Sequence, residues 1–367
     1  MKEKYPVVKM DRTTMQEFMP ILMNKGIFSN YLSLPIKEEI LETEKQRLGV
    51  KQLAPELERS ILSEVGYYRT SNFVVRDFGS YAIAFSAKLY MDYLGIMESE
   101  LLNQNSQGTD KIENGLNRVR LYKLAHRLVL IILAKVYENK RYTQLEITKQ
   151  EMLDLLGFTA AENHIYRYIS DALFSLSWLN YQIFRYGKKT MIDPNCKAFG
   201  TFIYNLVEDP KRYVIDVNEK FVGCVTALFN DRKDNFRENF IRGYLSYPTS
   251  IIPATKEYST PAYLLTHFLI TENGNCKLND KNYKVVAFTV ERFEAEMNIR
   301  ASRASRRKKE FLEALQEVGI ISDINPALAD LTNKNPLELE KTVVYIKIKR
   351  EINDLDSFIK SNLLSAN

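Results

Sequence analysis

One order of segments occurs twice in the last two thirds of the chain, and this repetition constrains the fold more than any other feature of the sequence. Each copy begins with an apolar helical segment and continues through a short β-rich stretch and two punctuated helices. Each copy then ends in β-rich residues. A helix-turn-helix followed by a β-hairpin has this order. We therefore predict a divergent internal repeat of two α+β modules; the alternative is two unrelated α+β stretches.

Helix caps mark the first copy. An apolar helix is predicted from Leu121 to about Glu138, and Thr148–Glu151 has the pattern of a capping box that starts a short helix ending at Gly157. Thr159–Glu162 repeats that pattern and predicts a second helix that runs to about Ser177. Its apolar positions have helical spacing, so we expect one buried face made of Ile165, Tyr168, Ile169, Ala172, Leu173 and Leu176.

A β-hairpin is predicted directly after these helices. Residues 179–186 and 199–206 are β-rich, and Gly187–Lys189 is a basic turn between them. A hairpin in this position is a wing. Residues 211–229 are predicted to form a strand and a helix that close the module.

The second copy has similar signals for the starts of its helices. Pro261 suits the first turn of an apolar helix that begins at about Thr260, and Thr289 is predicted to cap the next helix, with Phe288 and Phe293 as a hydrophobic staple. A third helix is predicted from near Ser302 to Gly319, with a buried face of Ala304, Phe311, Leu312, Leu315 and Val318. Strands follow at 320–324 and 342–350, the latter with Val344, Ile346 and Ile348 on one face.

The 367 residues and 45% hydrophobic content suit two or three domains. We expect an N-terminal extension and linker over 1–117, in which residues 81–96 could form helix or strand, and winged-helix domains over 118–240 and 241–367. The three cysteines have no metal-ligand or disulfide spacing. Neither a signal-peptide core nor an uncharged membrane-length run occurs, which predicts a cytoplasmic protein with no membrane partner.

The strongest charge feature is a run of six cations in ten residues without an acid: Arg300, Arg303, Arg306, Arg307, Lys308 and Lys309. Such a run can be a solvated face. This one lies in the N-terminal half of the predicted third helix, the half that meets base edges when a helix-turn-helix docks on DNA. Arg303, Arg306 and Arg307 are expected opposite the buried face. The run therefore predicts double-stranded DNA as a partner.

The first module offers a milder surface for the same role. The outer side of its predicted third helix carries Asn163, Tyr166, Arg167 and Ser170, and the wing tip carries Lys188 and Lys189. Asn and Arg can contact base edges in pairs of hydrogen bonds, and wing lysines contact phosphates. Alternatively, Tyr166 and the neighbouring His164 pack within the protein.

Catalytic chemistry has little support in the sequence. The three histidines form no metal-binding pair, and Gly187–Thr190 lacks the glycine-rich cradle of a phosphate loop. Asp209, Asp216 and Glu219 have ordinary surface spacing. We therefore predict no catalytic residue, cofactor or metal, and a protein that is not an enzyme. A nuclease or primase remains a weaker alternative that divalent-metal dependence would reveal.

The chain resembles the theta-type plasmid replication initiators, the Rep proteins built from tandem winged-helix domains. The resemblance spans about residues 118–350 and rests on LYKLAHRLVLIILAKV, ITKQEMLDLLGF followed by IYRYISDALFSLSWLNYQIF, IDVNEKFVGCV, and RRKKEFLEALQEVGII. It implies binding to repeated origin sites of a plasmid or phage-like replicon, melting of nearby DNA with host replication proteins, and a switch between homodimer and monomer. The long N-terminal extension departs from that family. A winged-helix transcription regulator or autorepressor is the alternative function.

Overall fold

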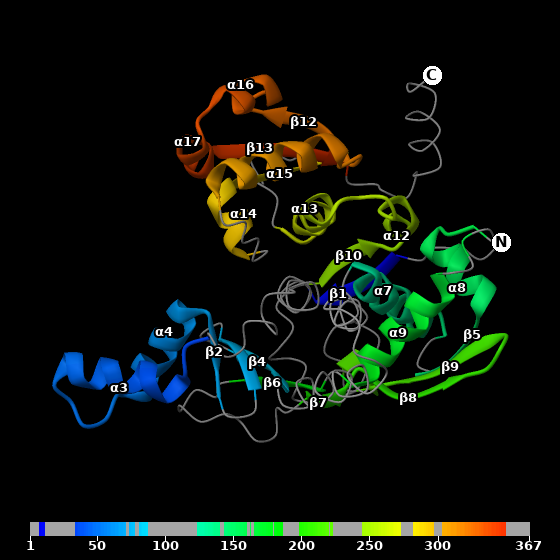
Figure 1. Ribbon diagram of the computed structural model, residues 1–367, viewed down its shortest axis with the longest axis horizontal. Helices are drawn as coiled ribbons and strands as arrows, with labels where there is room; N and C mark the ends of the chain where they lie inside the picture. Colours follow the sequence, from blue (N-terminus) through cyan, green and yellow to red (C-terminus); the bar gives the residue numbers. More distant parts are fainter. Residues whose placement is uncertain are drawn as a thin grey trace, which may run out of the picture. The chain divides into compact units, whose positions relative to one another are not determined.

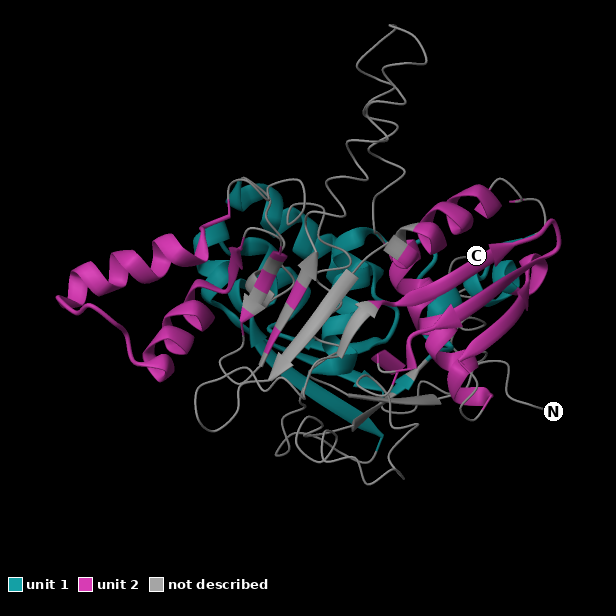
Figure 2. Ribbon diagram, turned by 90° about the horizontal axis from the view of Figure 1, so that it is seen from below, with its two compact units in different colours: residues 1–20, 152–160, 243–367 teal, residues 21–151, 161–242 magenta. Residues whose placement is uncertain are grey.

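The structure is a computed structural model of the chain (Figure 1). It describes residues 7–11, 34–70, 73–77, 81–86, 123–139, 143–159, 162, 165–178, 180–185, 198–219, 221–222, 244–272, 282–296 and 303–349. The chain divides into two units, one made of residues 1–20, 152–160 and 243–367 and the other of residues 21–151 and 161–242 (Figure 2). The domain boundaries expected from the sequence stay a prediction.

The N-terminal extension contains a helical hairpin and a β-meander. Its elements are α3 (Lys37–Leu48), α4 (Pro55–Val65), β2 (Tyr67–Arg69), β3 (Phe73–Asp77) and β4 (Tyr81–Ser86). Gly49 ends α3 in the left-handed region at a φ of 67°, and Pro55 starts α4 where its missing N–H costs nothing. The start of the ambiguous stretch 81–96 is thus strand. Residues 87–96, and residues 103–117 at the end of the expected extension and linker, lie outside the described residues.

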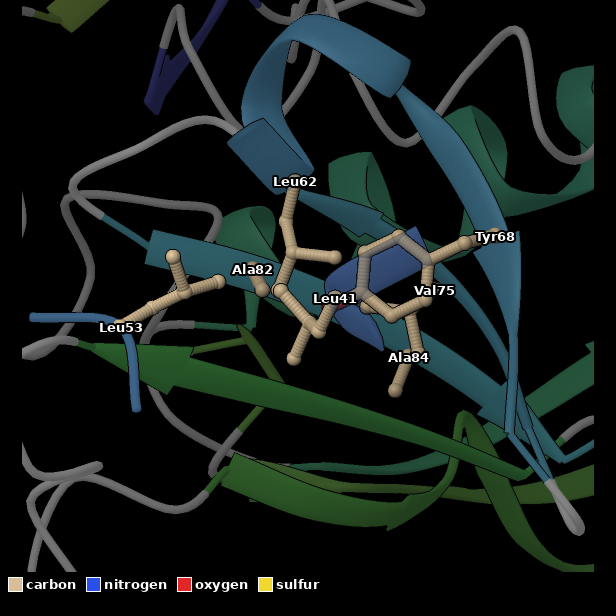
Figure 3. Packing of buried hydrophobic residues seen from close by; sticks show 7 residues of the cluster. All are labelled: Leu41, Leu53, Leu62, Tyr68, Val75, Ala82 and Ala84. Carbon is tan, nitrogen blue, oxygen red and sulfur yellow. The ribbon is translucent and has the colours of Figure 1, made fainter. Parts of the chain in front are cut away.

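A small apolar core holds the hairpin on the meander. Side chains from α3, α4, their connection and the three strands gather between the helices and the sheet (Figure 3), namely Leu41, Leu53, Leu62, Tyr68, Val75, Ala82 and Ala84. Each of them is at most 9% exposed. Burial of this apolar surface is what orders a segment whose sequence is otherwise highly charged.

The first repeat has, in chain order, a helix, a strand, two helices and two further strands, and its three strands form one small sheet. The elements are α7 (Lys123–Glu138), β5 (Gln144–Thr148), α8 (Lys149–Leu156), α9 (Ile165–Trp178), β8 (Ile203–Glu208) and β9 (Arg212–Val217). The antiparallel sheet has the order β5-β9-β8. The predicted first helix is confirmed. The Glu151 N–H donates to the Thr148 Oγ1 at 3.0 Å, and Gly157 has a φ of 77°, so the first cap and the left-handed stop are confirmed too.

Two details of the second helix were predicted wrongly. Helix α9 begins at Ile165, so Thr159 is not its N-cap, and Glu162 lies in a 3₁₀ turn of the connection. Tyr168 is 54% exposed, whereas Ile169, Ala172, Leu173 and Leu176 are buried as expected. On a helix with 100° per residue, Tyr168 lies just beyond the edge of that buried stripe.

The predicted wing is part of a larger sheet. Strand β6 (Asn180–Arg185) pairs with β7 (Ala198–Thr201), as expected for a hairpin, but it also pairs with β4, in a five-stranded sheet of order β2-β3-β4-β6-β7. The stretch 199–206 is divided at Phe202 between β7 and β8. The hairpin that completes the three-stranded sheet is β8–β9. Alternation of apolar and polar residues indicates a strand, but it does not indicate which other strand pairs with it.

The second repeat has the same order of elements. They are α13 (Thr260–Thr271), β11 (Tyr283–Thr289), α14 (Val290–Glu296), α15 (Ala304–Glu317), β12 (Ile321–Asn325) and β13 (Val343–Lys349), with α16 (Leu328–Asn333) and α17 (Pro336–Lys341) inserted between β12 and β13. The sheet order β11-β13-β12 matches that of the first repeat. Before them lie α12 (Ile251–Ala254) and β10 (Tyr244–Pro248), which pairs with β1 (Val7–Asp11). The chain is therefore mixed α+β and consistent with tandem winged-helix modules.

An aromatic cluster fixes the three helices of the second repeat to its sheet. Phe268 of α13 and Phe311 of α15 each contact Phe288 of β11 and Phe293 of α14, and Phe288 also contacts Phe293, with ring centroids 4.9–6.5 Å apart in these pairs. The Phe288–Phe293 distance of 6.0 Å confirms the predicted staple. On the predicted apolar faces, Val344, Ile346 and Ile348 are buried, whereas Leu312 is only partly buried and Ala314 takes a core position.

Candidate nucleic-acid interface

The outer face of α15 carries the exposed part of the cation run. The exposed residues of this segment are Arg303, Ser305, Arg306, Lys309, Glu313 and Gln316. The side chains of Arg306 and Lys309 are 71% and 74% exposed. Phe311, Ala314 and Leu315 form the opposite, buried side. The first turn of α15 therefore presents cations to solvent where the partial positive charge of the helix N-terminus already attracts anions.

Arg306 and Lys309 pair with acids of their own helix. Arg306 Nε lies 2.8 Å from Glu310 Oε1, and Lys309 Nζ lies 3.7 Å from Glu313 Oε1. Exposed pairs four residues apart on a helix are worth about 0.3–0.5 kcal/mol. Such pairs exchange readily for a phosphate or a base edge, so both cations are available to an anionic partner.

Arg307 has a different environment from its neighbours. Its side chain is 24% exposed, its Nε lies 3.0 Å from Glu294 Oε2 of α14, and its guanidinium also hydrogen-bonds Glu340 of α17. The hydrogen bond that Arg307 donates to Glu340 raises the pKa of Arg307, and burial raises the pKa of Glu294 even though Arg307 opposes that shift. The expectation that Arg307 lies opposite the buried face is wrong, because position 307 lies one turn before Phe311 and beside the core.

Lys308 is also engaged within the protein. Its Nζ donates to the carbonyl oxygens of Thr332 and Lys334 at 2.7 and 2.5 Å. These carbonyls end α16, where the helix leaves acceptors unsatisfied and carries partial negative charge. Arg300 lies outside the described residues. Of the six cations in the run, the described part of the structure therefore exposes Arg303, Arg306 and Lys309, while Arg307 and Lys308 hold the inserted helices.

The first repeat places its candidate residues around the start of α9. Arg167 is exposed, and the Tyr166 hydroxyl lies 3.5 Å from Gln150 Oε1 of α8. Asn163, His164, Lys188 and Lys189 lie outside the described residues. The structure thus brings Tyr166, Arg167 and Ser170 together on one helix.

Ser170 joins α9 to the β8–β9 hairpin through a polar network that the sequence did not reveal. Its Oγ donates to the carbonyl of Tyr166 and lies 3.0 Å from Glu208 Oε1 and 3.1 Å from the Tyr213 hydroxyl. Lys149 pairs with the same Glu208 at 2.6 Å. Burial raises the pKa of Tyr213 to about 12. The alternation of β9 places Tyr213 inward, but only the fold shows that its hydroxyl meets α9.

The turn of this hairpin is built on an aspartate. The Asp209 carboxylate accepts the backbone N–H groups of Lys211 and Arg212 at 2.7 and 2.8 Å and pairs with the Arg212 side chain, which also pairs with Glu146. These hydrogen bonds lower the pKa of Asp209. At this turn the Arg212 side chain therefore stands between two carboxylates, those of Asp209 and Glu146.

Among the residues that the structure describes, no group of three or more histidines, cysteines or acids is placed to hold a metal ion. Within the same ranges, every helix is too short or too polar to cross a membrane.

Comparisons with known proteins show similarity at the level of structure. No protein-family model matches the chain, and no curated protein matches it. Among solved structures, the chain is similar to a crystal structure of selenomethionine derivatives of domains 2 and 3 of RctB, with a TM-score of 0.40 and 11% sequence identity over 81% of this chain and 99% of that chain. A similarity at this level leaves the function to be argued from the residues of the chain itself.

Proposed function

We propose that the chain binds double-stranded DNA sequence-specifically through two winged-helix modules in tandem and initiates replication of a plasmid or phage-like replicon at repeated origin sites. The observation that supports DNA binding best is the outer face of α15. There, Arg303, Arg306 and Lys309 are exposed on the third helix of a module whose order is helix, strand, helix, helix and two strands. The third helix of such a module is the one that enters the major groove.

Each exposed cation suits a particular contact. Arg306 has the planar fork that hydrogen-bonds the O6 and N7 of guanine, and it projects from the outer face. Arg303 lies at the helix N-terminus, where a phosphate is favoured, and Lys309 one turn further on suits a second phosphate. Arg300 belongs to the same proposed surface.

The first module contributes a weaker second contact in this proposal. Arg167 is its exposed cation on α9, and Tyr166 and Ser170 lie on the same helix. The proposal adds Asn163 to this surface, and Lys188 and Lys189 as phosphate contacts. Ser170 already bonds Glu208 and Tyr213, so its part is to hold α9 against the hairpin. Two linked modules bind more tightly than either alone because the second contact forms at high effective concentration.

The assignment to replication initiation rests on the resemblance of residues 118–350 to the Rep proteins. Host replication proteins and a second copy of the chain are the proposed protein partners, in the cytoplasm, and the proposal includes no catalytic group, cofactor or metal. A winged-helix transcription regulator shares the DNA-binding surface and differs in the arrangement of its sites.

Selection of bound sequences from random duplex DNA with the full chain tests the proposal. Two or more direct repeats of one motif are expected for an initiator, whereas a single palindrome identifies a regulator. Cloning the selected sites into a plasmid without an origin then shows whether the chain supports its maintenance. Failure to enrich any sequence contradicts sequence-specific binding.

A further inference from the structure

The connection between β12 and β13 is not an extended hairpin loop. It contains α16 and α17, which pack against α15, and α17 also packs against α14. Asn335 closes a capping box with Glu338 at the start of α17, so the second inserted helix has a defined beginning. The part of a wing that usually reaches outward is folded here against the helices of its own module.

Polar contacts fasten this insertion to the cation run. Arg307 binds Glu340 of α17 and Glu294 of α14, and Lys308 binds the two carbonyls at the end of α16. Arg307, Glu340 and Glu294 have side chains that are 24%, 20% and 11% exposed. Removing one partner from a pair that is largely out of water leaves the other charge poorly solvated, so these contacts matter more than exposed pairs do.

The two residues that contact the insertion, Arg307 and Lys308, belong to α15, the helix that also carries the exposed Arg306 and Lys309. Arg307 and Lys308 lie between Arg306 and Lys309 in the sequence, so contacts to 307 and 308 fix the rotation of α15 about its axis. Rotation of the helix would move Arg306 and Lys309 together relative to a groove. A bidentate contact to a base tolerates little displacement, because it needs two hydrogen bonds in one plane.

We propose that Arg307, Lys308 and Glu340 are positioning residues, through which the inserted helices α16 and α17 brace α15 so that Arg306 and Lys309 meet DNA. The inference rests on the proposed DNA-binding function and assigns the six cations of the run to two tasks. Arg303, Arg306 and Lys309 contact DNA. Arg307 and Lys308 act through the protein.

The direction in which one substitution changes the affinity for duplex DNA distinguishes a positioning role from a purely electrostatic one. Glu340→Gln removes a negative charge from the module and changes no cation. If Arg307 and its neighbours act only as charges, affinity for duplex DNA rises. If they brace α15, affinity falls, by about threefold or more. Asp330→Asn, an exposed acid of α16, is the matched control, and it should leave affinity unchanged or slightly raise it.

The salt dependence of binding supplies a second readout that a positioning residue does not move. Each phosphate contact contributes about 0.9 to the slope of log affinity against log salt. Arg307→Gln and Glu340→Gln should weaken binding while the slope stays at the wild-type value. Lys309→Gln should lower the slope by about 0.9.

The experiment measures binding isotherms of the full chain and these variants on one duplex of selected sequence at four salt concentrations, with a thermal melt of each protein. Arg307→Lys keeps the charge but not the fork, so it should weaken binding like Arg307→Gln. The positioning role is contradicted if Arg307→Gln lowers the slope of log affinity against log salt. It is also contradicted if Glu340→Gln folds and raises the affinity for DNA. If Glu340→Gln does not fold, Arg307→Lys and Lys308→Met decide by the same slope test. A flat slope in the wild type would instead contradict the proposed function itself.

Discussion

Thr148 and Thr289 occupy equivalent positions in the two repeats. Each is the last residue of the first strand of a three-stranded sheet, and each hydroxyl accepts a hydrogen bond from the backbone N–H three residues later, from Glu151 at 3.0 Å and from Arg292 at 3.2 Å. The same cap therefore starts the second helix of both repeats. Together with the matching sheet orders, this favours a duplicated module over two unrelated α+β stretches.

Removing either cap should destabilise its helix by a similar amount. Thr148→Ala and Thr289→Ala should each cost about 1 kcal/mol, because an N-terminal N–H loses its acceptor. Thr148→Ser and Thr289→Ser keep the hydroxyl and should cost much less. Chemical denaturation of the four variants measures the difference, and an alanine variant as stable as its serine counterpart contradicts the cap.

Gly157 should be less replaceable than Gly49, although both have positive φ. A Cβ on Gly157 would lie 2.8 Å from the Cβ and 2.9 Å from the Cα of Pro253, whereas a Cβ on Gly49 would meet nothing within 4 Å. Gly49→Ala should cost about 1 kcal/mol for the left-handed backbone alone. Gly157→Ala should cost clearly more, since Pro253 must move. Thermal melts of both variants test this, and equal shifts contradict the close approach.

The two modules should contribute unequally to DNA binding. Arg306→Ala should cost about 1–3 kcal/mol and relax the preference at one base pair, because the fork that reads a guanine is lost. Arg167→Ala should cost less, since Arg167 is the one cation of α9, whereas Arg303, Arg306 and Lys309 are exposed together at α15. Isotherms on cognate and scrambled duplexes at fixed salt compare them. If Arg306→Ala binds like the wild type, the basic face of α15 is only solvated.

Alkaline pH should weaken the first module through Tyr213. Burial raises the pKa of Tyr213 to about 12, so the unfolded chain releases this proton first as pH rises. The stability that this group contributes is fully present below about pH 10 and is lost as pH rises toward 12. Tyr213→Phe removes the ionisable hydroxyl and with it this pH-dependent contribution to stability. The difference in unfolding free energy between wild type and variant should therefore shrink across that range; a constant difference contradicts the buried hydroxyl.

Helix caps, helix stops and hydrophobic staples in the sequence predicted the elements well. The pairing of strands that lie far apart in the chain explains what the sequence missed. The Thr148 cap, the Gly157 stop and the Phe288–Phe293 staple each depend on residues a few positions apart. The second partner of β6, besides the expected β7, is β4, about a hundred residues earlier in the chain, and an alternating pattern carries no record of that partner.

The same difference between local signals and long-range contacts applies to the candidate site. The sequence predicted that the cation run lies at the start of the third helix of its module, which α15 confirms. The sequence prediction placed both Arg306 and Arg307 opposite the apolar face, although position 307 lies one turn before Phe311 and so at the edge of that face. Only the insertion folded on α15, which brings Glu340 to Arg307 from 33 residues away, makes one of them a structural residue.

The salt dependence of duplex binding tests the central claim most directly. If the two modules together neutralise about six phosphates, the affinity of the full chain for a selected duplex should fall about a thousandfold between roughly 50 and 200 mM salt. Scrambled duplexes should show a similar slope with weaker binding, because phosphates do not carry sequence. An affinity that stays flat across this range contradicts the account, whatever the cation run does within the protein.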